Sequence, residues 1–575
     1  MTKVKKYLIE KRKVIKLNMN TRIICLSLQQ NHINRREKMT NKVFFLILAV
    51  TGLGWSNTVT SQTTAGEPCT FTEGVRYSQL VINSRINDFK ANQSDAGFGV
   101  FDSQGNLIAE PNYSMKNLDY VPGLVAKAII EAVYYYKDNS MVNVRPWYYA
   151  IQYYANTYDI AQDGKEGKCF DDINAVKLYF KLQEMAGNKT FAESPYFTND
   201  ETVSTAKKRF ADALTSIAIA NTDYVIKEST LAGAAGGWWH KSFYTDQMWC
   251  DGQYMGPALL AQMANEYTDY AAISDNDWDL ITKQFTISWH YLWNDEVKLL
   301  YHAFTADPAG EAAKIWVGIS AEPGAEVYHS AEYWGRATGW YFLALVDVLE
   351  QMMKAGLTAT ENFQTLYGYL QQLAAGIVAK QDVKTGCWYQ LLNYDDTYVA
   401  TDYNSDFCYT SSPVANYLES SCTAIFIASY LKGMRLGLFD ADYTDLAKKA
   451  YRGFVENFMV ADGMGGVHLV RCSKSAGLAG FAFRDGSANY YLMGKDTEPT
   501  STSGSNFYTE GKVLGGFIMA ATEYERLGDT ETGIVPVRKQ NATTSSYSLS
   551  GTKLSQPSRR GIYVKGGKKY LPTKE

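Results

Sequence analysis

The chain has 575 residues, enough for several average domains, with ordinary apolar and charged content and a net charge of -4. This charge argues against a nucleic-acid partner, because proteins that bind nucleic acid usually carry a basic face. The unusual feature is the aromatic content of 14%, with 42 Tyr, 25 Phe and 12 Trp. These rings fit either a large core with Tyr-rich walls or a groove in which sugars stack, since Tyr and Trp combine an apolar face with a polar group.

Residues 1–62 are predicted to be a leader and not part of the fold. A basic stretch precedes Met39, and an apolar run from Val43 to Trp55 follows it. This order is typical of a signal peptide, here over residues 39–61, with translation starting at Met39. The run is too short to cross a bilayer, so no membrane span is expected. We therefore expect an exported protein, either periplasmic or secreted to the cell surface.

The cysteines give no sign of a metal site. Seven lie beyond the leader, scattered at positions 69, 169, 250, 387, 408, 422 and 472. They form no CxxC pair, and no HExxH motif is present, so we expect neither a metal nor another cofactor. The odd number argues against a full disulfide framework, and most of these residues should be small buried apolar side chains.

The pattern from about residue 75 to 530 is helical, and we assign residues 63–530 to one all-α domain. Ser274 is the expected N-cap of the helix in "SDNDWDLITKQFTISWHYLW", and Gly356 the expected C-terminal stop of "YFLALVDVLEQMMKAG". In "LAKKAYRGFVENFM" one apolar stripe consists of Leu446, Ala450, Phe454 and Phe458.

Short aromatic, Gly-rich blocks recur between the helical stretches, for example "GGWWHKSF", "LLYHAF", "GCWYQLL" and "GMGGVHLV". Simple loop chemistry could explain them, because Gly marks many helix ends. Their spacing favours helical hairpins arranged in a ring whose loops meet at one end, where binding residues concentrate. Residues 531–575 are polar and end in short β-type pieces, "GIYVKGGKKYLP", too short to hold a core of their own.

One carboxylate has unusual neighbours. Asp251 lies in "QMWCDGQYMGP", among a Trp, two Gly, a Tyr and two Met. It could be a helix cap. It could instead be an acid whose pKa is raised by the apolar side chains of Trp249, Tyr254 and Met255, as proton-transfer chemistry requires.

Seven segments in order resemble glycoside hydrolase family 105, the unsaturated rhamnogalacturonyl hydrolases, and more distantly the unsaturated glucuronyl hydrolases of family 88. They are "FDDINAVKLYFKL", "GGWWHKSFYTDQMWCDGQYMGPALLA", "LLYHAF", "YWGRATGWYFLALVDVLE", "GCWYQLL", "LESSCTAIFIASYLKGMRLG" and "FRDGSANYYL". The resemblance covers about residues 75 to 525. It implies an (α/α)6 barrel that hydrates the C4=C5 double bond of a terminal unsaturated uronic acid on a pectin-derived oligosaccharide.

The same resemblance implies site residues. Asp251 matches the family's general acid and base. The second carboxylate lies in "FDDIN", where Asp171 is the first choice and Asp172 the alternative; an N-cap role remains open for this pair. His302 in "LLYHAF" matches a substrate-site histidine, although a lone histidine is more often a core or loop residue.

Further substrate contacts are implied around "WGRATGW". Arg336 could pair with the uronate carboxylate or form a structural ion pair. The other implied contacts are Trp334, Trp340, Trp249, His240, Gln247 and Trp388, the last as a stacking wall.

The chain departs from the family at several positions. Ala337 and Thr338 replace the usual Gly and Asn, which leaves the leaving-sugar preference open. Cys250 and Cys422 replace residues whose roles should be in packing. Alternatives that remain are an unsaturated glucuronyl hydrolase acting on other glycans, another α-toroid glycosidase or lyase, and a non-catalytic glycan-binding protein. The sequence does not indicate the oligomeric state.

Overall fold

The structure is a computed structural model of the chain. It describes residues 64–90, 100–101, 107–109, 119–136, 169–186, 227–266 except 242, 276–318 except 312, 327–528 except 464, 502 and 504–506, and four short strands between 546 and 570. The contacts of the chain divide it into Met1–Ser61 and Gln62–Glu575. The predicted leader and signal peptide lie outside the described residues, and so does most of the tail apart from its strands.

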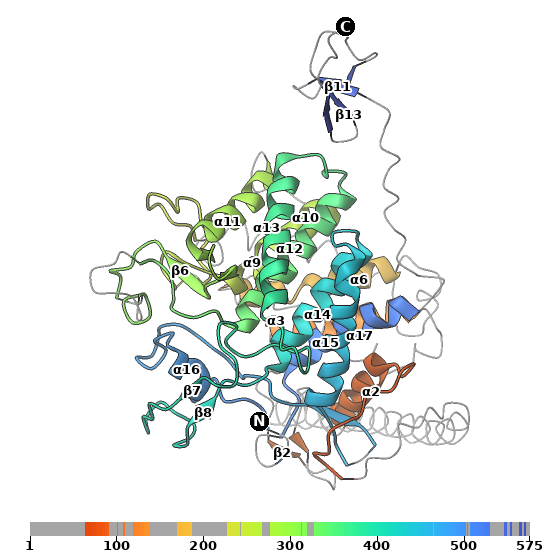
Figure 1. Cartoon of the computed structure of the whole chain (residues 1–575), viewed down its shortest axis with the longest axis vertical. Coiled ribbons are helices and arrows are strands. Elements are labelled where there is room, and N and C mark those ends of the chain that lie inside the picture. The colour runs from red at the N-terminus through yellow and green to blue at the C-terminus, as the bar shows by residue number, and fades with distance from the viewer. Residues whose placement is uncertain are drawn as a thin grey trace, which may run out of the picture. The chain divides into compact units, whose positions relative to one another are not determined.

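Six of the described helices form a closed inner ring. Each contacts the next in chain order, and the last contacts the first (Figure 1). In order they are α3 (Tyr120–Tyr136), α6 (Lys177–Ala186), α10 (Pro257–Glu266), α12 (Gly335–Lys354), α14 (Ser420–Arg435) and α17 (Gly511–Gly528). This ring is the inner layer of an (α/α)6 barrel, and it confirms the fold class predicted from the helical pattern.

An outer layer packs against this ring. α2 contacts α17, α11 contacts α10, α13 contacts α12 and α15 contacts α14. The outer helices are α2 (Tyr77–Lys90), α11 (Asp277–Leu292), α13 (Glu361–Ala379) and α15 (Thr444–Phe458). No helix among the residues with a described structure is long and apolar enough to span a bilayer.

The difference between the layers follows from residue patterning. Inner helix α14 is buried around nearly its whole circumference and carries small or apolar residues on all sides. Outer helix α15 is amphipathic and buries Ala450, Phe454 and Phe458 of the predicted stripe, whereas Leu446 is only partly buried. Close packing in the ring also needs small residues. A Cβ on Gly515 of α17 would lie 2.6 Å from the Leu124 side chain of α3.

Two helix ends test the predicted signals. α12 ends at Lys354, and Gly356 just beyond it has φ +74°, the left-handed conformation expected of a C-terminal glycine. The predicted N-cap of α11 is wrong. Asn276 is the cap, and its side chain accepts from the amides of Trp278 and Asp279; Ser274 lies outside the described residues.

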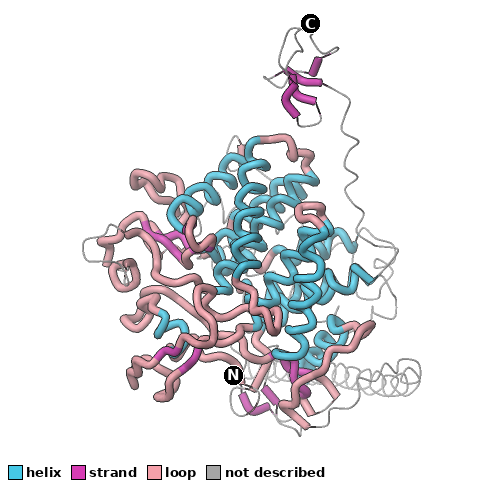
Figure 2. Tube along the Cα trace, in the orientation of Figure 1, coloured by secondary structure: helices cyan, strands magenta, loops and turns pink. Residues whose placement is uncertain are grey.

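Loops and short antiparallel strand pairs gather on one side of the helices (Figure 2). The pairs are β1 (Val100–Phe101) with β2 (Leu107–Ala109), β3 (Gln247–Trp249) with β6 (Ala303–Thr305), β4 (Trp293–Asn294) with β5 (Leu299–Leu300), β7 (Val399–Ala400) with β8 (Val414–Ala415), and β9 (Met459–Ala461) with β10 (Val467–Leu469). Several of the predicted aromatic blocks lie in these strands and the loops beside them.

Three short helices lie between the longer ones, and the C-terminal tail forms a sheet of its own. The helices are α5 (Phe170–Asn174), α9 (Cys250–Met255) and α16 (Ala488–Met493), with a 3-10 turn η2 at Ala441–Tyr443. The tail sheet has the order β12-β11-β13-β14, formed by Ser546–Ser548 (β11), Lys553–Leu554 (β12), Tyr563–Lys565 (β13) and Lys568–Tyr570 (β14). The β-type ending read from the sequence is therefore present.

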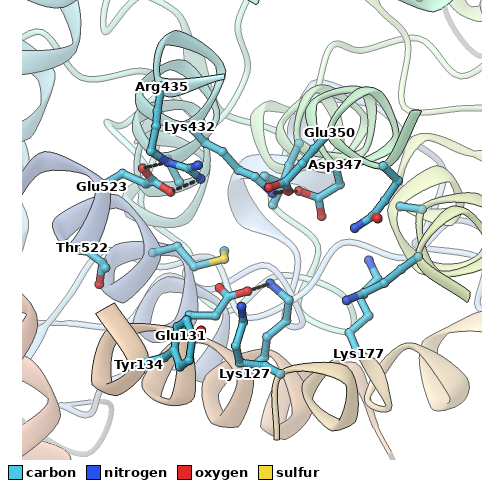
Figure 3. Close-up of a pocket in the computed structure, with 18 of the residues that line it drawn as sticks. Lys127, Glu131, Tyr134, Lys177, Asp347, Glu350, Lys432, Arg435, Thr522 and Glu523 are labelled. Carbon is cyan, nitrogen blue, oxygen red and sulfur yellow. Dashed lines mark hydrogen bonds and ion pairs between the residues drawn. The ribbon is translucent and has the colours of Figure 1, made fainter. Parts of the chain in front are cut away.

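Charged residues collect at both ends of the inner ring. Acidic residues lie at or just before the starts of five inner helices or the short helices that lead into them: Asp119, Asp171, Asp251, Glu419 and Glu510. The sixth, α12, carries Arg336 in its first turn. At the opposite end, Lys, Arg, Asp and Glu side chains of all six inner helices line a cavity of about 200 Å³ (Figure 3).

Candidate active site

Strand pairing brings Asp251 and His302 together. β3 ends at Trp249, and Asp251 is the second residue of α9, which begins directly after it. Trp249 pairs with Ala303 of β6, and the amide of Cys250 donates to the carbonyl of His302 at 3.0 Å. This register places His302 Nε2 3.4 Å from Asp251 Oδ2. The histidine is fully buried, and 13% of the aspartate side chain is exposed.

Asp171 occupies the same position on α5 that Asp251 has on α9. A β-bridge between Cys169 and Lys241 brings the two segments together. Lys241 Nζ lies 2.6 Å from Asp171 Oδ2, and His240 Nε2 lies 3.8 Å from Oδ1. The neighbouring Asp172 accepts instead from the thiol of Cys169 at 3.4 Å. Of the two predicted carboxylates, the structure therefore directs Asp171 toward His240.

Neither carboxylate is a helix cap. The N-cap positions are held by Cys169 for α5 and Trp249 for α9, and neither makes a side-chain capping bond. Asp171 and Asp251 lie within the first turns, where the positive end of a helix dipole favours negative charge. The capping alternative is therefore wrong for both residues.

His240 connects the two carboxylates. Its ring stacks on Trp249, with centroids 4.8 Å apart and planes 16° apart. A Cβ on Gly252 would lie 3.1 Å from His240 Nδ1, so the glycine next to Asp251 allows the close approach predicted for it. Burial, only partly offset by the charge of Asp171, lowers the pKa of His240 to about 4. His240 is therefore neutral at physiological pH.

Aromatic and amide side chains hold this group in place. The rings of His240, Trp249 and Tyr244 form a mutually stacked cluster, with Tyr244 5.0 Å from Trp249 and 6.4 Å from His240. The indole N–H of Trp249 donates to Gln247 Oε1 at 3.3 Å, and Gln247 is fully buried. The predicted residues Trp249, His240 and Gln247 thus form one packed unit beside Asp251.

The predicted rise in the pKa of Asp251 is wrong. Burial does raise the pKa of this carboxyl, as the apolar neighbours suggested. Contact with His302, chiefly its side-chain hydrogen bond, and the charge of Arg336 help to outweigh burial, and the net pKa lies below its ordinary value. Asp251 is therefore ionised in the unliganded protein.

Arg336 forms the structural ion pair and not an open anion site. Its guanidinium lies 3.8 Å from Glu419, and both side chains are buried. Nη1 also donates to the Ser473 carbonyl at 2.6 Å and to Ser421 Oγ at 3.1 Å, and the group lies over the ring of Trp334. The predicted uronate contact is not supported by this arrangement.

Trp334 lies at the site, but two other predicted tryptophans do not offer a face to a substrate. The Trp334 ring lies 4.8 Å from that of His302. Trp340 is fully buried and stacks on Tyr254 at 4.8 Å. Trp388 is also fully buried, packs against Phe426 and donates to the carbonyl of Ile377. The stacking-wall prediction for Trp388 is therefore wrong.

Two residues of the site were not predicted. Asp119 caps α3 by accepting from the Val121 amide at 2.9 Å, and burial together with the nearby Asp171 raises its pKa to about 7. Tyr491 in α16 places its hydroxyl 2.7 Å from His302 Nδ1. Asp119 could have been predicted from the sequence, because it is an acidic residue directly before an apolar helical segment. Tyr491 lies within the motif "FRDGSANYYL", where nothing separates it from its tyrosine neighbour Tyr490.

The cysteines are free and most are buried, as predicted. Six of the seven are buried and Cys408 is partly exposed. Among the residues whose structure is described, no group of three or more His, Cys, Asp or Glu side chains is placed to hold a metal ion.

Known proteins match this chain in sequence and in fold. The profile of Glycosyl Hydrolase Family 88 matches residues 103–528. Protein Atu3128 of Agrobacterium fabrum and the 24.9 kDa protein in the picA locus of Rhizobium radiobacter are each 30% identical over 200 residues, which is 34% of this chain and 72% of the relative.

Two solved structures share the fold. A family 105 glycoside hydrolase of C. acetobutylicum is 24% identical, with a TM-score of 0.52 over 78% of this chain and 99% of that one. A possible family 105 member from Salmonella enterica is 17% identical, with a TM-score of 0.51 over 80% of this chain and 96% of that one. Since the family profile covers most of the chain, including every site residue above, the protein belongs to Glycosyl Hydrolase Family 88 and is a glycoside hydrolase.

Proposed function

We propose that the enzyme removes a terminal 4,5-unsaturated uronic acid from lyase-generated oligosaccharides by hydrating the C4=C5 double bond, with Asp251 as general acid and base. The observation that carries this proposal is the Asp251–His302 pair. Asp251 Oδ2 and His302 Nε2 lie 3.4 Å apart, and neither atom has a hydrogen-bond partner among the described residues. Buried polar atoms are normally satisfied, and this long contact to His302 leaves lone-pair capacity on Asp251 for a proton or a substrate.

The chemistry needs one proton donor that becomes a base. Protonation of C4 by Asp251 leaves an oxocarbenium ion at C5. Water adds there and gives its proton to the Asp251 carboxylate, and the resulting hemiketal opens and releases the next sugar. The proton is restored, and one water is consumed in each turnover.

The reaction begins with a protonated Asp251, whereas the pKa of Asp251 is lowered in the unliganded protein. The cycle therefore requires that substrate binding raise this pKa. The uronate carboxylate brings a negative charge, and the bound sugar excludes water. Both changes favour the neutral form of a nearby carboxyl group. Substrate binding therefore protonates Asp251 at the start of the reaction.

A double-displacement glycosidase is less well supported. That mechanism uses a second carboxylate as nucleophile or base beside the glycosidic bond. Asp171 is the second carboxylate of this site, and it is engaged by Lys241 at 2.6 Å. Asp171 is better placed to set the charge around His240 and Asp251 than to attack a sugar.

The experiment follows the ultraviolet absorbance of the double bond during incubation with unsaturated rhamnogalacturonan disaccharide, in parallel with a panel of unsaturated glucuronyl disaccharides. We expect the wild type to remove the chromophore and Asp251→Asn to be slower by on the order of 10³-fold. In H₂¹⁸O the label should enter at C5. Label at the anomeric carbon, or no reaction with any unsaturated substrate, would overturn the proposal.

Two finer features belong to the same proposal. Rhamnose from pectin is the expected sugar behind the uronate, and glucuronate-bearing glycans are the alternative that the substrate panel tests. We also propose export to the periplasm or the cell surface. N-terminal sequencing of protein from fractionated cells should show cleavage near residue 61, and an intact N-terminus in the cytoplasmic fraction would contradict export.

A further inference from the structure

The hydroxyl of Tyr491 lies 2.7 Å from Nδ1 of His302, and both side chains are fully buried. The other ring nitrogen, Nε2, faces Asp251. One histidine thus lies between a phenol and the carboxylate proposed to carry out the chemistry. Neutral imidazole carries its proton on only one nitrogen, and the partner of the other nitrogen decides which.

The surroundings of Tyr491 make its hydroxyl the donor. Burial raises the pKa of Tyr491 well above its ordinary value, so the phenol keeps its proton. His302 Nδ1 is the hydrogen-bond partner of this hydroxyl among the described residues. If Nδ1 carried the proton, the phenol hydrogen would lack an acceptor there, and a buried unsatisfied donor is unfavourable. The arrangement therefore favours a proton on Nε2.

The backbone around Tyr491 is anchored to the same site. Gln390 Nε2 donates to the carbonyl of Tyr491 at 3.1 Å, and Gln390 Oε1 accepts from the Trp334 indole at 3.1 Å. The rings of Trp334 and Trp249 pack against His302 at 4.8 and 5.2 Å. The imidazole is thereby held in place by two rings, and the hydroxyl selects which of its nitrogens carries the proton.

We propose that Tyr491 is a positioning residue that fixes the Nε2–H tautomer of His302 and so aims an N–H donor at Asp251. This proposal rests on the proposed function. The donor stabilises the Asp251 carboxylate that forms when C4 takes the proton and that then accepts a proton from water. Without the hydroxyl, the Nδ1–H tautomer becomes accessible and turns the Nε2 lone pair toward Asp251.

The test compares Tyr491→Phe with Tyr490→Phe. Tyr490 is the preceding residue of α16, and its hydroxyl donates to Asp496 at 3.2 Å, away from His302. We expect kcat of Tyr491→Phe to fall about tenfold to a hundredfold with KM within about twofold, because the lost contact stabilises the reacting carboxylate and does not touch the substrate. Tyr490→Phe should keep the wild-type kcat. Thermal unfolding of both variants controls for loss of the fold.

A second readout does not depend on turnover. In ¹⁵N-histidine NMR of the unliganded full chain, with the His302 signal assigned by its loss in His302→Gln, the wild type should show a protonated Nε2 and an unprotonated Nδ1. Tyr491→Phe should shift this pattern toward the other tautomer. A wild-type signal from protonated Nδ1, or a folded Tyr491→Phe with unchanged kcat, would overturn the proposal. If no unsaturated substrate reacts, the proposed function fails, and the NMR measurement still decides the tautomer.

Discussion

The two ends of the inner ring are both rich in buried charge, but they satisfy it differently. At the end where the inner helices finish, ion pairs join Lys127 to Glu131 at 2.8 Å, Arg435 to Glu523 at 2.7 Å, and Lys432 to both Asp347 and Glu350 at 2.7 Å (Figure 3). At the end where the helices begin, Asp171 pairs with Lys241 and Arg336 with Glu419, but several buried polar atoms lack hydrogen-bond partners among the described residues: His240 Nδ1, Asp251 Oδ2, His302 Nε2 and Trp340 Nε1. Among the described residues that line the opposite cavity, Arg526 Nε is the one buried side-chain atom without a partner.

This difference separates a structural role from a chemical one. At the end where the helices finish, Lys and Arg side chains pair with acidic side chains. These cations also complement the negative ends of the helix dipoles. Unpartnered polar atoms beside a carboxylate and two histidines lower the stability of the fold. They are useful only when a ligand supplies the missing hydrogen bonds. A search for the densest cluster of charged residues would therefore have placed the active site at the wrong end of the ring.

The largest expected effect lies at the paired end. Lys432→Met leaves Asp347 and Glu350 without their shared cation, and breaking a largely buried pair typically costs about 3 kcal/mol of unfolding free energy. Denaturant unfolding measures this loss, and kcat of the folded variant should be unchanged. A large fall in kcat at full stability would show that the two ends are not functionally separate.

Next comes the second carboxylate. Asp171→Asn removes the charge that faces His240 and Lys241, and we expect kcat to fall about a hundredfold, since a nearby negative charge supports protonation of the site. Asp172→Asn is the matched control and should change kcat less than about threefold. Steady-state kinetics on the unsaturated disaccharide decides between them, and the reverse order would assign the role to Asp172.

Asp119, at the end of the ring where the helices begin, makes the stability of the fold depend on pH. Its pKa in the folded protein is about 7, above the value in the unfolded chain, so the folded state holds this proton more tightly. Stability from this group is present at low pH and is lost as pH rises from about 4 to 7.

Asp119→Asn keeps a capping oxygen for α3 and removes the titration. The variant should be more stable than the wild type at pH 7, with the gain vanishing near pH 4. Thermal unfolding across this range provides the measurement. A gain that does not change with pH would show that Asp119 does not titrate there.

The smallest expected effect concerns a pair of glycines. Gly252→Ala places a Cβ 3.1 Å from His240 Nδ1, whereas Gly368→Ala in α13 meets no atom within 4 Å. We expect about a tenfold loss of kcat for Gly252→Ala, because a small displacement at the site misaligns the reacting groups. Gly368→Ala should keep full activity and gain up to about 1 kcal/mol of stability. Equal activities would mean that His240 can move without consequence.

Sequence reasoning succeeded where the signal is local. The stripe of α15, the glycine after α12 and the recurring aromatic blocks follow from side-chain periodicity and backbone preference, and together they predict the ring. The acid in "WCDG" could also be singled out, because its apolar neighbours are adjacent in the chain.

The sequence did not predict properties that depend on contacts between segments far apart in the chain. Nothing near Arg336 in the sequence shows that Glu419 will pair with it, and nothing near Trp388 shows that Ile377 and Phe426 will enclose it. The pKa of Asp251 was predicted in the wrong direction for the same reason. Its apolar neighbours are local, whereas His302 reaches it only through the pairing of β3 with β6.

That pairing also defines a transferable unit. Gln247–Trp249 and Ala303–Thr305 lie side by side, and the chain between them contains α9, α10 and α11. A segment whose two ends meet in space can be exchanged as a unit when its outward contacts are kept, here those of α10 with α6 and α12 in the inner ring. The acid and its histidine would travel together in such an exchange, which makes residues 247–305 the natural cassette for building chimaeras between related enzymes.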